Sequence, residues 1–377
     1  MSNWNIKELF SPVQYKTIDV DDSIQTILFK NETYLGRSTE VFAYLGIPPS
    51  PQGQSSPGMV CVHSGGGTAF KEWVEIWVNR GYAAIAMDLS GRDGSGNRLA
   101  TGGPEQDHQA KFSTTSEWQD MWTYQAIAAV VRANSLLRNM STVDPLRIGI
   151  TGISWGGYLT CIVSGVDSRF ACAIPVYGCG FLQQNSADDW MQIFAVMSSE
   201  QQQEWHDKCD PSVYLSSASM PMLFVSGTND FAYPIDSLEK CCGLPTGEVT
   251  RCIRLEMPHS HEAGWNPIEI GVFADQHLTR GLPLPTIHRV DKSSGLIRAN
   301  ITSPSAIRDG YLLFTKDTHR WMNRKWQKVP AELINDGVEA SIPDKATACF
   351  LAIEDQRGAY VNTPYLDLNV EWSFAPK

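Results

Sequence analysis

Hydrophobic and polar positions follow two different patterns along the first part of the chain. Residues 14–47 alternate polar and apolar side chains, which indicates antiparallel strands with one buried face. Farther along, short continuous apolar runs replace this alternation, as is typical of parallel strands covered on both faces. These runs lie at residues 59–62, 83–87, 146–150, 171–176 and 222–225.

Helical spacing occurs between the apolar runs. In residues 116–138, apolar side chains recur three or four positions apart and share one helix face; they are Trp118, Trp122, Ala126, Ala129, Ala133 and Leu137. Strands that alternate with helices predict an α/β fold with a mostly parallel sheet. Residues 181–219 are polar with a few interspersed aromatic residues, and they predict an insertion that lies over the sheet.

The pattern changes again near residue 283. Residues 282–285 read Leu-Pro-Leu-Pro and predict a linker, after which short alternating segments are separated by turn signals. These segments lie at residues 295–301, 310–315, 338–342 and 347–353. The sequence therefore predicts two domains, an α/β domain over residues 1–283 and a small β-sandwich over residues 284–377.

Composition and charge exclude several classes of function. The 377 residues are 42% hydrophobic, which argues against a disordered chain, and no run of 18 apolar residues predicts a membrane-spanning helix. The net charge of −11 disfavours nucleic acid and anionic membranes as partners. The beginning of the chain shows no apolar leader. A cytoplasmic protein and a secreted or periplasmic one whose signal peptide has been removed both remain open.

Nine cysteines do not indicate a disulfide framework, because their number is odd and the chain is long. Cys61, Cys161 and Cys172 lie in apolar segments and are expected to be free, buried thiols. The Cys241-Cys242 pair receives no assignment.

The first chemical motif is Gly-Ile-Ser-Trp-Gly at residues 152–156, the G-x-S-x-G pattern of a nucleophile elbow. A strand pattern precedes it and a helix-forming segment follows. A sharp turn between strand and helix needs small neighbours, and the helix N-terminus favours developing negative charge. The context predicts Ser154 as a nucleophile rather than a glycine-rich turn without chemistry.

A nucleophilic serine needs donors for the oxyanion that forms when it attacks. One expected donor is the backbone N–H of Trp155, the residue after the nucleophile. Another is expected from the loop His-Ser-Gly-Gly-Gly at residues 63–67, with the N–H of Gly65 or Gly66 favoured. His63 is interpreted as a structural residue that fixes this loop.

An acid and a histidine are expected to follow the serine in that order. Asp230 comes directly after the strand pattern at 222–227, with Asp236 as a weaker rival. The next strand pattern runs into a loop with two histidines, His259 and His261. His261 is preferred because it lies farther from the strand end, where the loop can turn back toward the serine. The His-x-His spacing would also fit zinc, but no third ligand group accompanies it, so no metal is predicted.

In these motifs, residues 30–282 resemble an α/β-hydrolase, similar to acetyl xylan esterases and to the catalytic domain of prolyl-oligopeptidase-like enzymes. Asp88 begins a turn similar to the Asp-x-x-Gly-x-Gly turn of these families, although Arg92-Asp93-Gly94 replaces its last glycine. The C-terminal segment resembles modules of some prolyl-oligopeptidase-like hydrolases. Neither the propeller of prolyl oligopeptidases nor a double-Glu motif is evident, which points away from a peptidase.

The resemblance implies acyl transfer through Ser154, His261 and Asp230, without a cofactor. The predicted substrate is a small-molecule or saccharide ester, and most specifically an acetyl ester of a carbohydrate. Tryptophans near the predicted site suit sugar rings but also suit core packing; they are Trp155, Trp190, Trp205 and Trp265. A serine peptidase or amidase and a non-catalytic glycan-binding protein are the alternatives, and a homo-oligomer remains open.

Overall fold

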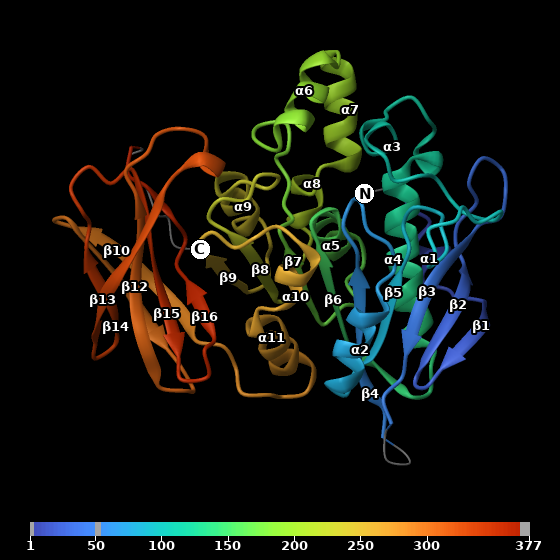
Figure 1. Ribbon diagram of the computed structural model, residues 1–377, viewed down its shortest axis with the longest axis horizontal. Coiled ribbons are helices and arrows are strands. Elements are labelled where there is room, and N and C mark those ends of the chain that lie inside the picture. The colour runs from blue at the N-terminus through green and yellow to red at the C-terminus, as the bar shows by residue number, and fades with distance from the viewer. Residues whose placement is uncertain (1–3, 50–53, 370–377) are drawn as a thin grey trace.

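Two β-sheets organise the protein in the computed structural model, which describes residues 4–49 and 54–369 (Figure 1). The first three residues of the chain, where no apolar leader was found, lie outside this description. The first sheet has nine strands in the order β1-β2-β3-β5-β4-β6-β7-β8-β9. Its strands are β1 (Tyr15–Asp21), β2 (Ile24–Lys30), β3 (Glu40–Gly46), β4 (Ser56–Val62), β5 (Ala83–Met87), β6 (Val143–Ile153), β7 (Cys172–Val176), β8 (Met222–Gly227) and β9 (Val249–Arg254).

The two sequence patterns correspond to two halves of this sheet. Strands β1, β2 and β3 pair antiparallel, whereas β5, β4, β6, β7, β8 and β9 pair parallel. Every residue of β4, β5, β7 and β8 is buried, as the continuous apolar runs predicted. The register places Val62 beside Gly152, so the loop after β4 leaves the sheet next to the Gly-x-Ser-x-Gly turn after β6.

Helices cover both faces of the parallel strands. Helices α2 (Lys71–Asn79) and α11 (Ile268–Leu278) pack on one face, and α4 (Trp122–Arg138) and α5 (Trp155–Val166) pack on the other. The helix expected over residues 116–138 begins later, because a short 3-10 turn precedes α4. Helix α4 is buried on nearly all sides rather than on one face. Its polar side chains hydrogen-bond the segments that cover it; Arg132 Nε, for example, donates to the Lys30 carbonyl at 2.9 Å.

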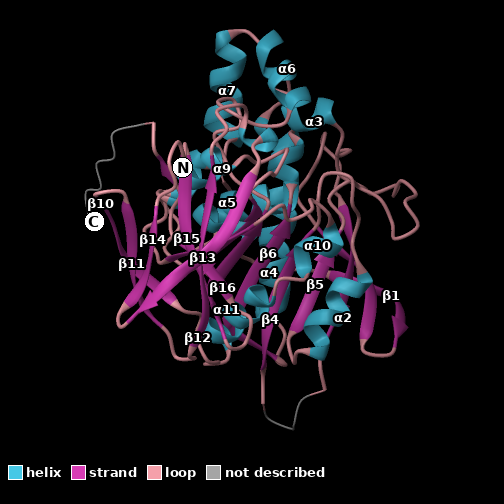
Figure 2. Ribbon diagram, turned by 60° about the vertical axis from the view of Figure 1, so that its left-hand side comes forward, coloured by secondary structure: helices cyan, strands magenta, loops and turns pink. Residues whose placement is uncertain are grey.

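The expected insertion contains three helices between β7 and β8. They are α6 (Asp188–Val196), α7 (Ser199–Cys209) and α8 (Ser212–Leu215), and α6 and α7 rise above the upper end of the sheet in Figures 1 and 2. Three aromatic side chains of this insertion are buried against Phe112, which ends α3 (His108–Phe112); they are Trp190, Phe194 and Trp205. The remaining helices are α1 (Ile6–Leu9), α9 (Ile235–Cys242) and α10 (His261–Trp265).

The C-terminal region forms a separate antiparallel sheet in the order β10-β11-β14-β13-β12-β15-β16, with β17 paired to β15. This sheet curls, so that β14 and β11 also contact β15. Its strands are β10 (Thr286–Ser293), β11 (Leu296–Thr302), β12 (Ile307–Thr315), β13 (Trp326–Ile334), β14 (Gly337–Ser341), β15 (Ala348–Asp355), β16 (Tyr360–Asn362) and β17 (Leu366–Asp367). The sequence pattern missed β10 and β13, because only one residue of each is fully buried and Pro330 lies within β13, and it missed the short strands β16 and β17.

The two sheets meet where β16 lies beside β9, as Figure 1 shows. The Ile253 N–H donates to Asn362 Oδ1 at 2.6 Å. Glu269, fully buried on α11, accepts from the Tyr360 N–H at 2.5 Å and from Arg254 Nη2 at 2.6 Å. These buried polar contacts hold the C-terminal sheet at a defined place next to the first sheet.

All nine cysteines are free and buried, including the three that were expected to be. Within residues 4–49 and 54–369, no helix is both long and apolar enough to cross a membrane.

Candidate active site

Ser154 lies between the end of β6 and the beginning of α5 in a strained conformation. Its φ of 59° and ψ of −119° place a non-glycine residue in a region that L-residues rarely adopt. A Cβ on Gly152 would lie 2.1 Å from the Gly156 carbonyl oxygen, and a Cβ on Gly156 would lie 1.9 Å from the Val62 carbonyl oxygen. Only glycine fits at these two positions, so the turn has the geometry predicted for a nucleophile elbow.

A continuous hydrogen-bond relay connects Ser154 to Asp230. His259 Nε2 lies 2.8 Å from Ser154 Oγ, and His259 Nδ1 lies 2.7 Å from Asp230 Oδ2. The three residues follow the carboxyl ends of β6, β9 and β8, which meet at one edge of the parallel sheet. The arrangement is the one required for a serine activated by an imidazole that a carboxylate orients.

The structure corrects the choice of histidine, because His261 does not contact Ser154. The chain turns back toward the serine at His259, and His261 already begins α10, with Ser260 as its N-cap. The Tyr177 hydroxyl donates to the Pro258 carbonyl at 2.6 Å, and the Tyr177 ring stacks on His259 with centroids 4.6 Å apart. His259 therefore reaches Ser154 although it lies only a few residues after the end of β9.

His261 instead holds the glycine loop after β4. Its Nε2 accepts from the Ser64 N–H at 3.1 Å and lies 2.9 Å from Ser64 Oγ. Burial among Phe70, Trp73 and Trp265 lowers the pKa of His261 to about 3, with His63 and His259 contributing further. The neutral imidazole can therefore accept hydrogen bonds from the loop at any pH well above 3.

His63 also fixes this loop, in agreement with its structural interpretation. Its Nδ1 lies 2.6 Å from the Ser64 carbonyl oxygen, and its Nε2 accepts from the Leu89 N–H at 2.9 Å. Burial lowers the pKa of His63, so the neutral form with Nδ1 protonated fits both contacts.

The structure brings the predicted oxyanion donors close together. A Cβ on Gly65 would lie 2.2 Å from Trp155 Cδ1, so the glycine loop packs directly on the residue after the nucleophile. A Cβ on Gly66 would meet no atom within 4 Å, so this glycine faces open space. The Trp155 N–H belongs to the first turn of α5, where helical N–H groups have no partner within the helix.

Asp230 is buried and held by its own loop. Its Oδ1 accepts from the N–H groups of Ala232 at 2.9 Å and Tyr233 at 2.8 Å, which leaves Oδ2 for His259. The neighbouring Asn229 donates from Nδ2 to two carbonyls of the C-terminal region, Met322 at 3.0 Å and Arg324 at 2.6 Å. The rival acid Asp236 lies elsewhere and accepts from Asn185 Nδ2.

Sequence reasoning missed the aromatic side chains that surround His259. Besides Tyr177, they are Phe231, with ring centroids 4.9 Å apart, and Tyr233, with ring centroids 6.4 Å apart. The phenol of Tyr233 is buried, and its hydroxyl has no geometrically acceptable partner among the described residues. Phe231 is 53% exposed. Phe231 and Tyr233 follow the predicted acid Asp230 within three residues, and this was the sequence signal that could have revealed them.

The tryptophans that were considered as sugar platforms are mostly core residues. Trp155, Trp190 and Trp205 are at most 5% exposed, and Trp265 packs against His261 and Trp73. Phe231, which contacts His259, keeps an exposed aromatic surface.

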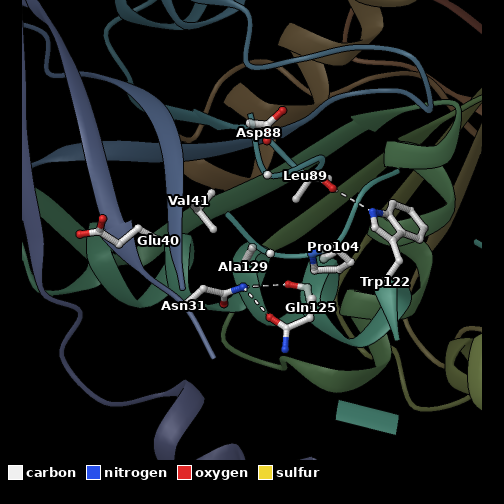
Figure 3. Close-up of a pocket in the computed structure, with 12 residues that line it drawn as sticks. Asn31, Glu40, Val41, Asp88, Leu89, Pro104, Trp122, Gln125 and Ala129 are labelled. Atoms are coloured by element: carbon white, nitrogen blue, oxygen red, sulfur yellow. Dashed lines mark hydrogen bonds between the residues drawn. The ribbon is translucent and has the colours of Figure 1, made fainter. Parts of the chain in front are cut away.

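A small cavity is lined in part by the loop that follows β5 (Figure 3). It is lined by Asn31, Val41 and Trp122 among others, and its volume of about 20 Å³ suits about one water molecule rather than a substrate. In the parts of the chain that the structure describes, no three His, Cys, Asp or Glu side chains gather as metal ligands.

The fold and the relay are those of an α/β-hydrolase with a serine nucleophile, resembling acetyl xylan esterases and prolyl-oligopeptidase-like enzymes. Residues 68–243, which include Ser154 and Asp230, match the sequence model of the prolyl oligopeptidase family. An uncharacterized peptidase of Bacillus subtilis (strain 168), YuxL, is 23% identical over 221 residues. That match covers 53% of this chain but only 30% of the relative's length.

Solved structures show the same fold at low sequence identity. Acetyl xylan esterase from Paenibacillus sp. R4 superposes with a TM-score of 0.59 and 20% identity, covering 73% of this chain and 92% of that one. Pyrococcus horikoshii acylaminoacyl peptidase gives 0.53 and 18% identity, covering 69% of this chain and 42% of that one. The two neighbours act on different substrate classes according to their names, so the likeness establishes the fold and leaves the substrate to other arguments.

Proposed function

We propose that this protein is a serine hydrolase that cleaves carboxylic esters through an acyl-enzyme. The observation that carries the proposal is the relay from Asp230 through His259 to Ser154, with both contacts shorter than 3 Å and the serine on a strained elbow.

The contacts of the relay support the following sequence of proton transfers. His259 Nε2 takes the proton of Ser154 Oγ while Oγ bonds to the ester carbonyl carbon. Asp230 holds Nδ1–H and stabilises the imidazolium. The N–H groups of Trp155 and of Gly65 or Gly66 stabilise the oxyanion. His259 then gives its proton to the leaving alcohol, and water releases the acid from Ser154 by the same steps in reverse.

The proposed substrate is a short-chain ester, most specifically an acetyl ester, on a carbohydrate. Phe231 supports this proposal because an exposed aromatic ring beside His259 offers an apolar face to a sugar ring at the leaving-group side. The likeness to an acetyl xylan esterase over 92% of that chain is consistent with it.

The C-terminal sheet is proposed to act as a compact accessory domain of the β-sandwich type, beginning near residue 284. Its turn at 322–324 hydrogen-bonds Asn229, directly before the acid. This contact supports a role of the C-terminal sheet in shaping the site.

Hydrolysis of p-nitrophenyl acetate by the wild type and by Ser154→Ala tests the proposal. We expect the variant to lose about 10³-fold or more in kcat and to resist labelling by a fluorophosphonate, with unchanged circular dichroism. Release of acetate from acetylated xylo-oligosaccharides would then test the carbohydrate. Equal rates for the two proteins on several short-chain esters would refute an esterase that uses Ser154.

A serine peptidase or amidase is the second candidate, and the match of residues 68–243 to the prolyl oligopeptidase family favours it. Esters and anilides with the same acyl group separate the two functions. A higher kcat/KM on dipeptide anilides than on the matched esters would establish the peptidase. The reverse order would support the esterase.

A further inference from the structure

A buried lysine lies behind the glycine loop of the proposed oxyanion hole. Lys111, on the short helix α3, is only 2% exposed. Its Nζ lies 3.5 Å from the Gly65 carbonyl oxygen and 4.9 Å from the centroid of the Trp155 ring. A Cβ built on Gly65 would lie 2.7 Å from this nitrogen. The ammonium therefore touches the two residues whose N–H groups are proposed to bind the oxyanion.

The surroundings of Lys111 fix its position from several sides. Its backbone carbonyl accepts from Trp205 Nε1 at 3.0 Å. The Trp122 ring lies 5.9 Å from Nζ, and its indole N–H donates to the Leu89 carbonyl, a contact drawn in Figure 3. Aromatic faces attract a cation, so these rings favour the charged amine at this place.

Among residues 4–49 and 54–369, no carboxylate oxygen forms an ion pair with Lys111; Asp107 and Asp189 act on it only from a distance. Burial of an unpaired ammonium is unfavourable, and a methionine of similar shape would be less costly at this position. A buried ammonium at Lys111 has a physical reason if an anion forms beside it during the reaction.

We propose that Lys111 is a positioning residue of the oxyanion hole: its ammonium holds the Gly65 carbonyl and places a buried positive charge behind the donors that meet the oxyanion. The inference rests on the proposed function, because the anion is the tetrahedral intermediate formed on Ser154. In a site that excludes water, such a charge favours the transition state over the neutral substrate.

The charge of Lys111 should be visible in the pH dependence of kcat. Burial lowers the pKa of its ammonium to about 8, partly offset by Asp107 and Asp189, while His63 faces it from the loop after β4. Above pH 8 the amine becomes neutral and its support for the oxyanion is lost. Wild-type kcat should therefore fall above this pH, whereas Lys111→Arg, which stays charged, should not show this fall.

Five proteins test the proposal on p-nitrophenyl acetate: wild type, Ser154→Ala, Lys111→Met, Lys111→Arg and Lys240→Met. Lys240 is the matched control, a surface lysine that also lies over an aromatic ring, that of Phe181. We expect Lys111→Met to lose about 10- to 100-fold in kcat with little change in KM. Its melting temperature should equal or exceed that of the wild type, because an unpaired buried charge has been removed. Lys240→Met should match the wild type.

Three results would overturn the proposal. One is wild-type kcat in Lys111→Met. Another is a loss of kcat together with a lower melting temperature in both Lys111→Met and Lys111→Arg, which would show a purely structural lysine. The third is a loss confined to esters that carry a carboxylate, which would assign Lys111 to the substrate instead. If the wild type is no faster than Ser154→Ala, the proposed function itself fails, and this result is distinct from all three.

Discussion

Replacement of each histidine of the 259–261 segment by alanine tests the relay most directly. His259 bridges Ser154 and Asp230 at 2.8 and 2.7 Å, so His259→Ala removes both the base and its link to the acid. We expect kcat on p-nitrophenyl acetate to fall about 10³-fold or more, equivalent to about 4 kcal/mol of transition-state stabilisation. The free energy of unfolding should also fall, by about 1–3 kcal/mol, because Oδ2 of the buried Asp230 loses its hydrogen-bond partner.

His261→Ala should lower the free energy of unfolding more, and kcat less, than His259→Ala does. Its Nε2 is the acceptor for the N–H and the hydroxyl of Ser64, and its ring is packed against aromatic side chains. Loss of an acceptor for the part-buried donors of Ser64 costs about 1 kcal/mol, and the lost aromatic packing adds to this, so the free energy of unfolding should fall by about 3 kcal/mol. The glycine loop should shift, with a loss of about 10-fold in kcat.

Urea unfolding and steady-state kinetics on the same preparations separate these effects, with the exposed His288→Ala as a control that should change neither. A folded His261→Ala protein that loses as much kcat as His259→Ala would refute the assignment of the base. So would a His259→Ala protein that keeps more than about a tenth of wild-type kcat, since a general base contributes about 10²- to 10⁴-fold.

Three further predictions follow from the same contacts. Gly156→Ala should lower kcat by more than 10²-fold and destabilise the fold by about 3 kcal/mol, since its Cβ would lie 1.9 Å from the Val62 carbonyl oxygen; wild-type kinetics and melting temperature would contradict this. Asn229→Ala should cost about 2 kcal/mol in urea unfolding, because it removes two hydrogen bonds to the turn at 322–324. His261 has its pKa lowered from 6.5 to about 3, so the unfolded state binds a proton that the folded state does not between these pH values. Stability should fall as pH drops from 6.5, by up to about 1.4 kcal/mol per pH unit, and less steeply in His261→Gln.

The parallel part of the fold was predictable because its physical signature is local. Strands buried on both faces need continuous apolar side chains, and β4, β5, β7 and β8 have them. The outer strands of the C-terminal sheet carry a weaker signature. In β13 only Trp326 is fully buried, so its sequence does not differ clearly from that of an exposed loop.

The site shows the same division between local and long-range information. The elbow at Ser154 depends on glycines within three positions, and a short motif describes it completely. The choice between His259 and His261 depends on where α10 begins and on Tyr177, which is about 80 residues away in sequence and anchors Pro258. Distance from the strand end was therefore a poor guide, because a distant side chain decides where the loop turns.

The loop that carries the acid is the clearest case of information absent from local sequence. Asn229 binds carbonyls 93 and 95 residues later, and Arg320 of the same C-terminal region pairs with Asp188 at the start of α6 and donates to the Ser186 carbonyl. Through the loop between β12 and β13, the C-terminal sheet thus contacts both the acid loop and the helical insertion. Because Asp230 is adjacent to Asn229, any displacement of that sheet moves the group that orients His259. Asn229→Ala should therefore lower kcat as well as the free energy of unfolding, because it releases the loop that holds Asp230.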